Sequence, residues 1–238
     1  MNVLVNYNKG WRTWGDMIDF SPAPFHRRRL ILKTARSLEF KSVLDVGCGN
    51  GALLGELEKK SLLQLVGVDL SELVIKENGQ RLSGLRFHAL DVSKNALEEE
   101  FDLVICSEVL EHIDNLAAAL ANLRRMCRRY LIITVPTGRV FPIDQKMGHV
   151  RHFSSTEIRD CLKPHGLRVL LLKKWGFPFH TLYKHLINLR PNACLNHFAE
   201  AKYGRLEMLV SKLLRLLFYL NLGTGGLQIL CLAEVESR

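Results

Sequence analysis

Three glycines in a short run carry the clearest chemical signal of the chain. Gly47, Gly49 and Gly51 follow Asp45 at every second position, after an apolar run typical of a strand and before a run typical of a helix. Glycine tolerates positive φ and lets a ligand approach the backbone closely. The free N–H groups of a helix start attract a carboxylate or a phosphate. A dinucleotide site usually has the spacing Gly-x-Gly-x-x-Gly, and Ala52 stands where its last glycine would fall.

Two carboxylates follow this turn at the ends of predicted strands. Asp69 ends the next strand, eighteen residues after Gly51, and Asp91 ends the strand after that. A carboxylate in the first position can accept hydrogen bonds from both hydroxyls of a ribose. The pattern therefore favours a nucleoside-containing ligand. Simpler structural roles stay open, because Asp45 could only tighten the turn and Asp91 could only cap a helix.

A run of acids and a histidine, residues 107–112, marks the substrate side. If this run is helical, Glu108, Glu111 and His112 lie on one face, at i, i+3 and i+4. His112 could act as a general base oriented by Glu111. The three side chains could instead hold a divalent cation, or Glu108 and His112 could only brace the cofactor pocket.

A second polar group, residues 148–153, follows the fifth predicted strand. We expect this loop to return over the same pocket, where His149 and Arg151 could contact an acceptor or complete a metal site. An ordinary loop with solvated basic residues explains the same pattern.

The elements that must position these residues alternate between strand and helix. Strands are predicted at 42–46, 63–68, 85–89, 101–106, 130–135, 167–172 and 227–235. Helices are predicted at 25–38, 52–59, 72–82, 115–128 and 156–162, the last with Ser154 or Ser155 as its N-cap and Gly166 just after its end. This alternation predicts crossover connections and a mostly parallel sheet. Two nearby prolines, Pro22 and Pro24, predict an irregular segment before the first helix.

Four motifs in register resemble those of class I S-adenosylmethionine (SAM)-dependent methyltransferases, in the manner of the type 11, 12 and 23 methyltransferase domains. They are the glycine turn and the segments 66–69, 89–92 and 101–104. The resemblance covers about residues 40–175, and residues 226–235 resemble the final antiparallel strand of that family. It implies an α/β, Rossmann-like sheet of seven strands, mostly parallel, with helices on both faces. The run 108–112 is similar to that of ubiquinone-pathway O-methyltransferases.

The resemblance also implies roles for individual positions. Asp45 and the turn would line the amino-acid end of SAM, Asp69 would bind the ribose, and Asp91 would reach the adenine amino group with Val92 beside the ring. Ser107 and Glu108 would lie near the transferred methyl group. The cofactor-binding set is Asp45, Gly47, Cys48, Gly49, Asn50, Gly51, Asp69, Leu70, Asp91, Val92, Ser107 and Glu108. The candidate catalytic set is His112, Glu111 and His149, and the candidate metal set is Glu108, Glu111 and His112.

Composition limits the class of protein and its location. Of the 238 residues, 47% are hydrophobic and 24% are charged, which is ordinary for a globular domain. The six cysteines form no CxxC pair, the start of the chain does not resemble a secretory signal, and no run of eighteen apolar residues occurs. We expect reduced thiols and a cytoplasmic protein, with a peripheral site at a membrane surface as an alternative. The net charge of +9 fits either an anionic partner or solvated basic residues.

Residues 175–225 interrupt the alternating pattern as a basic and apolar insertion. They contain an apolar helix, expected at 206–220 and largely buried because apolar residues surround much of it. Three roles compete: a substrate lid, a homodimer interface, or a contact with a membrane surface. Basic residues interleaved with aromatics also fit RNA, but nucleic acid ranks low because no RNA-binding module is visible.

The sequence thus predicts an N-terminal cap at 1–40, a SAM-binding core at 41–174, the insertion at 175–225 and a closing strand at 226–238. The expected reaction moves a methyl group to an oxygen, and less readily to a nitrogen or carbon, of a glycan, lipid or quinone-type small molecule. SAM is the expected cofactor, and a divalent metal is not favoured. A SAM-binding partner or regulatory protein without catalysis, and an RNA methyltransferase, remain alternatives.

Overall fold

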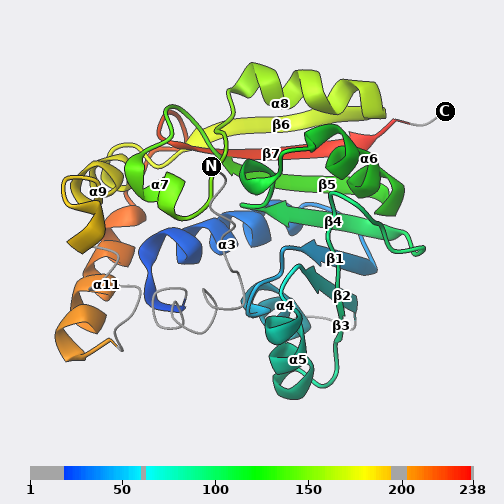
Figure 1. Cartoon of the computed structure of the whole chain (residues 1–238), viewed down its shortest axis with the longest axis horizontal. Coiled ribbons are helices and arrows are strands. Elements are labelled where there is room, and N and C mark those ends of the chain that lie inside the picture. Colours follow the sequence, from blue (N-terminus) through cyan, green and yellow to red (C-terminus); the bar gives the residue numbers. More distant parts are fainter. Residues whose placement is uncertain (1–18, 60–62, 194–202, 237–238) are drawn as a thin grey trace.

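A seven-stranded mixed sheet forms the centre of the computed structural model, which describes residues 19–59, 63–193 and 203–236 (Figure 1). The strand order is β3-β2-β1-β4-β5-β7-β6, and β7 pairs antiparallel with both β5 and β6 while the other pairs are parallel. The strands are β1 Ser42–Val46, β2 Gln64–Asp69, β3 Arg86–Ala89, β4 Phe101–Ser107, β5 Cys127–Pro136, β6 Leu167–Trp175 and β7 Gln228–Val235. The expected sheet, with its antiparallel last strand, is confirmed.

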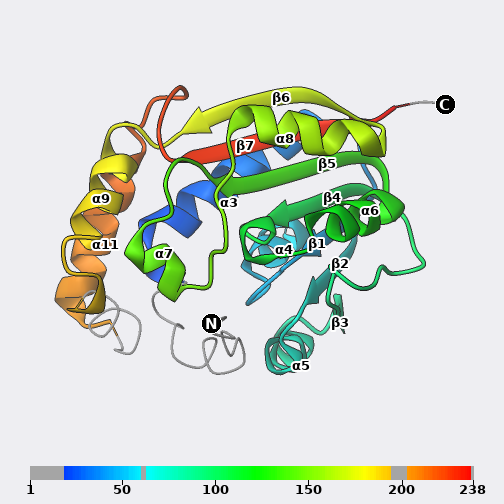
Figure 2. The same ribbon diagram turned by 45° about the horizontal axis from the view of Figure 1, so that its top comes forward.

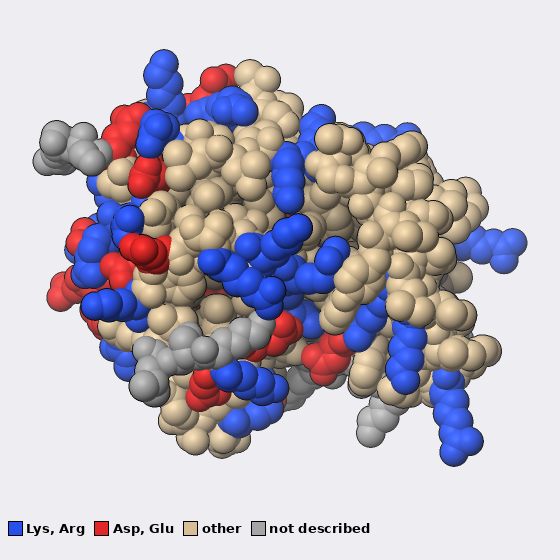
Figure 3. Space-filling model, turned by 180° about the vertical axis from the view of Figure 1, so that it is seen from behind, with Lys and Arg blue, Asp and Glu red and all other residues tan. Residues whose placement is uncertain are grey.

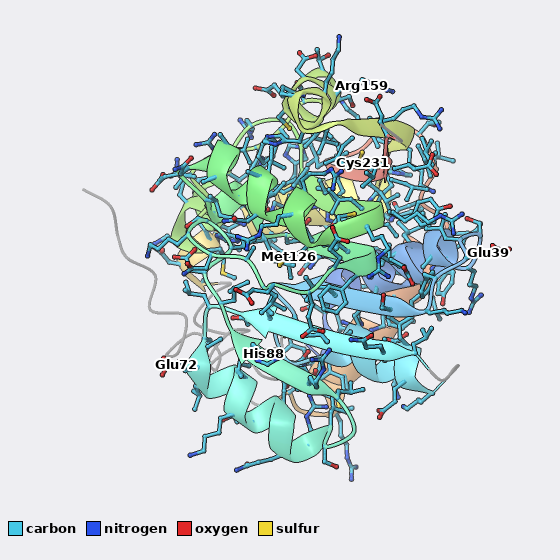
Figure 4. The ribbon with its side chains drawn as sticks, turned by 90° about the vertical axis from the view of Figure 1, so that its right-hand side faces the viewer. Glu39, Glu72, His88, Met126, Arg159 and Cys231 are labelled. Atoms are coloured by element: carbon cyan, nitrogen blue, oxygen red, sulfur yellow. The ribbon has the colours of Figure 1, made fainter. Side chains whose placement is uncertain are left out.

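Helices cover both faces of this sheet (Figures 1 and 2). Helices α3 and α4 pack on one face, and α6 and α8 pack on the other. Figure 4 shows α8, which carries Arg159, at one end of the sheet, and β3, which carries His88, toward the other. The α-helices are α3 Pro22–Ala35, α4 Ala52–Glu58, α5 Glu72–Arg81, α6 Leu116–Met126, α7 Pro142–Lys146, α8 Ser155–Leu162, α9 Phe179–Ile187 and α11 Arg205–Phe218; two 3₁₀ turns are η1 Leu110–His112 and η2 Lys163–His165.

Alternation along the strands divides the core into two clusters. Leu44 and Val46 of β1 pack under α6 and α8, whereas Val43 packs under α3 and α4. Because side chains alternate across a strand, Asp45 points to the same face as Val43, at the carboxyl end of β1. Parallel strands covered on both faces need nearly continuous apolar runs. The sequence provides such runs in β1, β4 and β5, which are buried almost throughout.

The predicted N-cap and terminal glycine of α8 are confirmed, whereas the prediction that Pro22 and Pro24 prevent a helix is wrong. Ser154 accepts a hydrogen bond from the N–H of Glu157 at 3.1 Å, and Gly166 ends the following turn with a positive φ. The two prolines expected to prevent a helix lie instead in the first turn of α3, which begins at Pro22. Proline fits there because its missing N–H has no intrahelical partner in that turn and its fixed φ is already helical.

The insertion after β6 differs from expectation in its burial. Helices α9 and α11 lie side by side at the end of the molecule that is on the left in Figures 1 and 2, and α11 contacts α3. The prediction of a largely buried helix at 206–220 is wrong, because Leu206, Leu216 and Leu220 are all more than 60% exposed. Within the described residues, no helix is both long and apolar enough to cross a membrane.

Candidate active site

The glycine turn lies at the carboxyl end of β1 and depends on the absence of side chains. Gly47, Gly49 and Gly51 have φ angles of 72°, 51° and 67°, which are strained for any other residue. The N–H groups of Gly47 and Cys48 donate to the Val68 carbonyl at 2.8 and 3.0 Å, which ties the turn to β2. A Cβ atom on Gly47 would lie 2.2 Å from Cγ2 of Val109. The segment that carries the acid–histidine run therefore packs directly on the turn.

Asp69 lies at the edge of the same turn, next to Asp45. Its Oδ2 accepts a hydrogen bond from the Gly49 N–H at 3.0 Å, and its Oδ1 accepts one from the Ser71 N–H at 2.9 Å. Burial raises the pKa of Asp69. Burial and the neighbouring charge of Asp69 raise the pKa of Asp45 to about 8. Two buried carboxyl groups this close together favour a cationic ligand.

We expect the affinity for SAM to rise with pH because of Asp45. The raised pKa means that the unliganded protein carries a proton on Asp45 at neutral pH, whereas a cationic ligand prefers the ionised carboxylate. Binding then releases a proton, and the affinity increases by up to about 30-fold between pH 6.0 and pH 7.5. Isothermal titration in buffers of different ionisation enthalpy measures both quantities. Asp45→Asn should bind more weakly with a flat profile; a flat profile in the unmodified protein would contradict the assignment.

The residues expected around the adenine have local roles in the unliganded protein. Asp91 accepts hydrogen bonds from the N–H and the hydroxyl of Ser93 at 3.0 and 2.6 Å and pairs with Lys94 at 2.9 Å. These contacts stabilise a local turn, and no helix begins between Asp91 and β4, so the helix-capping role that the sequence left open is wrong. Val92 is buried, and Leu70 after β2 is 53% exposed. An exposed leucine next to Asp69 suits the flat face of a nucleobase or sugar.

Glu108 departs most clearly from the expected geometry. The run 107–112 is not a regular helix: Glu108 has a φ of 56°, and only η1 is helical. The helix on which Glu108, Glu111 and His112 would have shared one face is therefore not formed. The Glu108 carboxylate instead pairs with Arg27 of α3 at 3.2 Å and accepts hydrogen bonds from Thr134 and Gln228 at 3.3 and 3.4 Å. Left-handed backbone in a non-glycine residue persists only where its surroundings hold it in place.

Replacing Arg27 tests whether its ion pair with Glu108 stabilises this part of the fold. We expect Arg27→Met to lower the free energy of unfolding by about 1–3 kcal/mol, because it leaves a mostly buried carboxylate without its cation. Arg28→Met is the matched control, since Arg28 pairs with Glu56 at the same 3.2 Å but Glu56 is more exposed, and it should cost less than about 1 kcal/mol. Urea denaturation gives both values. Equal losses for the two variants would argue against a special role for Arg27.

The remaining acid and histidines form one cluster over η1. The Val150 N–H donates to the Glu111 carbonyl at 2.9 Å, which folds the 148–152 loop over this turn as expected. The rings of His112 and His149 meet edge to face at 4.7 Å between centroids. His149 Nδ1 lies 3.2 Å from Nε2 of His152. Ligand atoms of Glu111, His112 and His149 lie within 4.8 Å of one another, so the structure assembles this set without Glu108.

Burial controls protonation in this cluster. It raises the pKa of Glu111 well above its ordinary value, and Glu108 adds to the shift. It lowers the pKa of His112, and together with His112 and Lys184 it lowers the pKa of His149 to about 2. Burial therefore favours the neutral form of both imidazoles and of the Glu111 carboxyl group. Neither carboxyl oxygen of Glu111 has a hydrogen-bond partner within the described part of the chain.

Sequence reasoning missed two residues behind the cluster. Asp144 of α7 binds Lys184 of α9 through one oxygen and lies 3.5 Å from His152 through the other. No local motif marks these positions, because they come from separate segments and meet only in the fold. Arg151, expected to face an acceptor, instead donates to the backbone carbonyl of Asp114 at 3.1 Å. Ser107 bonds to the hydroxyl of Thr134 at 2.9 Å.

Comparison with known proteins identifies the family. A methyltransferase domain model matches residues 23–172. A ubiquinone biosynthesis O-methyltransferase of Hydrogenovibrio crunogenus is 34% identical over 210 residues, which cover 76% of this chain and 85% of that protein. The protein of the same name from Bordetella bronchiseptica is 37% identical over 141 residues, which cover 55% of this chain and 54% of that protein.

Solved structures share the fold at low sequence identity. The N-methyltransferase NodS from Bradyrhizobium japonicum, in complex with S-adenosylhomocysteine, has a TM-score of 0.63 at 17% identity, with 97% of this chain and 98% of that chain covered. The [4+2]-cyclase SpnF has a TM-score of 0.59 at 16% identity, with 89% and 81% covered. These neighbours bear on the fold alone.

The sheet order, the glycine turn and the paired carboxyl groups define a SAM-binding fold of the Rossmann-like type. The chain belongs to the methyltransferase domain family, and it is a class I SAM-dependent methyltransferase with a small-molecule acceptor. The residues present fit the cofactor, because the buried carboxyl groups of Asp45 and Asp69 beside the glycine turn suit a cationic ligand with a ribose.

Proposed function

We propose that this methyltransferase transfers the SAM methyl group to a hydroxyl oxygen of a quinone-type small molecule. The observation that carries the proposal is the cluster of Glu111, His112 and His149, which packs on the cofactor turn through Val109. A phenolic hydroxyl needs a nearby proton acceptor before it can attack, and neutral imidazoles supply one. The name of the relatives, ubiquinone biosynthesis O-methyltransferase, supports the acceptor class.

The protein contributes position and proton transfer. Bound SAM supplies a methyl group on an electrophilic sulfonium. The glycine turn, Asp45 and Asp69 would hold that cofactor in place. Holding two reactants in line at near-attack distance lowers the barrier by about 7–11 kcal/mol in favourable cases. In this mechanism Glu111 loses its proton to solvent when the acceptor binds, His112 takes the hydroxyl proton as the methyl group is transferred, and the Glu111 carboxylate stabilises the resulting imidazolium. His149 and His152 hold the cluster in place from the loop above.

A divalent cation is the second candidate for this cluster. The observation that favours it is Glu111, whose buried carboxyl oxygens have no partner among the described residues although two imidazoles lie beside it. A cation there would ionise Glu111 and lower the pKa of an acceptor hydroxyl. With His112 as the base, we expect dialysis against a chelator to leave at least half of the activity. A loss of about 100-fold that Mg²⁺ or Mn²⁺ restores would transfer the role to a cation.

An acceptor panel tests the proposed reaction directly. The full chain is incubated with radiolabelled SAM and with catechols, hydroxylated quinones, glycans, amines or RNA, and the methylated atom is located by mass spectrometry. We expect label on the oxygen of the catechols and hydroxyquinones. SAM binding without any transfer would support the non-catalytic alternative, and salt-sensitive transfer to RNA would support an RNA methyltransferase.

We further propose that the reaction takes place in the cytoplasm. The five described cysteines are free thiols, which suits a reducing compartment. A reporter fused to the chain and separated by cell fractionation would locate it, and recovery from the periplasm or the medium would refute this location.

A further inference from the structure

Helix α11 presents a continuous leucine-rich stripe to solvent. The exposed side chains recur at intervals of three and four residues, which places them on one helix face. They are Leu206, Leu209, Val210, Leu213, Leu216, Leu217 and Leu220, with exposed fractions between 41% and 69%. Soluble monomers rarely expose contiguous apolar patches of this kind without a partner.

Helix α9 extends this surface. Leu182, Leu186 and Leu189 recur at i, i+4 and i+7, and all three are at least 55% exposed. Phe177 and Leu222, at the points where the chain enters and leaves the insertion, are also about half exposed. We call these twelve residues the apolar face. Figure 3 shows this side of the molecule as a broad tan area at the right, with Lys and Arg side chains at its edge.

The opposite side of α11 is fixed to the body of the protein, so the stripe points outward in the folded chain. Phe218 is buried, His26 of α3 bonds to the Arg215 carbonyl at 2.8 Å, and the Arg215 guanidinium donates to the Asp19 carbonyl at 2.6 Å. Lys184 of α9 binds Asp144 behind the candidate active site. The apolar face is therefore a permanent feature of the fold, and α9 connects it to the catalytic cluster.

The charge around the apolar face indicates what covers it. In residues 177–193 and 203–222 the exposed basic side chains are Arg190, Arg205 and Lys212, while Lys184 and Arg215 bind groups of the protein itself, and the acidic side chain is Glu207. A second copy of the chain would bring this basic border against itself across a two-fold axis, which like charges oppose. An anionic lipid surface attracts the same border while its acyl region accepts the leucines.

We propose that α9 and α11 dock this protein on anionic membrane surfaces, with the apolar face in the interfacial region and Arg190, Arg205 and Lys212 toward lipid headgroups. The protein lies on the bilayer and does not cross it. Docking would place the catalytic cluster next to the phase in which an apolar acceptor dissolves. The docking itself goes beyond the proposed function, because it requires neither SAM nor an acceptor.

Vesicle flotation with the full chain tests this proposal. Vesicles of phosphatidylcholine alone are compared with vesicles that also contain phosphatidylglycerol, at two salt concentrations. We expect at least about tenfold stronger binding to the anionic vesicles, weakened by salt. The double variant Leu213→Gln with Leu216→Gln, and separately the charge variant Lys212→Glu, should each bind at least about fivefold more weakly. Leu170→Gln on β6, an exposed leucine far from α11 in the sequence, is the matched control and should bind normally.

Three results would overturn the docking proposal. The first is no flotation with either kind of vesicle, and the second is equal flotation of the unmodified protein and the double variant Leu213→Gln with Leu216→Gln. The third is a protein that binds no lipid but forms a stable dimer in sedimentation velocity, which the double variant abolishes. Titration of S-adenosylhomocysteine shows that each variant is folded, because the cofactor turn lies outside the insertion. Methyl transfer to a water-soluble acceptor is assayed in parallel, so that failure of docking is distinguished from failure of the proposed reaction.

Discussion

Gly47→Ala should weaken SAM binding by at least about 100-fold. The new Cβ would lie 2.2 Å from Cγ2 of Val109, and the backbone at this position has a φ of 72°. An alanine in left-handed backbone costs about 1–2 kcal/mol, and an extra carbon in a packed site costs about 1–3 kcal/mol. The turn must shift to relieve both, which moves the backbone against which the cofactor would lie. Isothermal titration with SAM or S-adenosylhomocysteine measures the loss.

Two further variants show whether the collision is the cause. Gly79→Ala in α5 is the matched control, because nothing lies within 4 Å of its Cβ position, and it should keep full affinity and gain up to about 1 kcal/mol of stability. Adding Val109→Ala to Gly47→Ala should restore part of the affinity, since it removes the collision and leaves the backbone strain. Unchanged binding by Gly47→Ala would remove the glycine turn from the cofactor site.

The fold and the cofactor turn could be predicted because their determinants are local. Each parallel strand is a continuous apolar run, each crossover needs a helix, and the carboxyl ends of such strands meet at one edge of the sheet. Asp45 and Asp69 therefore had to lie close to Gly49 once the strands were correctly placed, and the hydrogen bond from Gly49 to Asp69 follows from that order.

The acid–histidine cluster could be predicted only in part. His149 was expected over the same pocket from the position of its loop, but Asp144 and Lys184 carry no local signal, since they are forty residues apart and belong to different helices. The left-handed backbone of Glu108 is set by Arg27, Thr134 and Gln228, which come from three other elements. A periodic pattern cannot reveal a conformation that distant residues impose.

Helix α11 shows that apolar periodicity alone does not predict whether a helix face is buried. The leucines of its stripe were visible in the sequence, and their abundance was interpreted as burial. The spacing identifies an apolar face but not what covers it, because a core and a membrane select the same side chains. In the structure the polar Ser211 is buried against the protein while Leu213 and Leu216 face outward.

Glu111→Gln should lower kcat by about 100-fold or more while SAM affinity and stability stay nearly unchanged. Burial favours the protonated form of Glu111 in the unliganded protein, and glutamine has nearly the shape of that neutral acid, so the fold should not be disturbed. Glutamine cannot ionise, however, and the reaction needs a carboxylate either to stabilise the imidazolium of His112 or to hold a cation. General acid–base groups contribute about 10²–10⁴-fold to rates.

The comparison of rate with binding separates catalysis from packing at this position. If Glu111 only braced the pocket, its substitution by a near-isostere would leave kcat intact, and this outcome would reject the catalytic role. Glu77→Gln on the exposed side of α5 is the control for a lost carboxylate, and it should leave both kcat and SAM affinity unchanged. A carboxyl group that is fully buried, finds no hydrogen-bond partner among the described residues and lies beside two imidazoles is costly to keep. The free-energy cost of burying this carboxyl group is explained if Glu111 ionises only when the acceptor binds. The carboxylate would then stabilise the transition state and lower the barrier to methyl transfer.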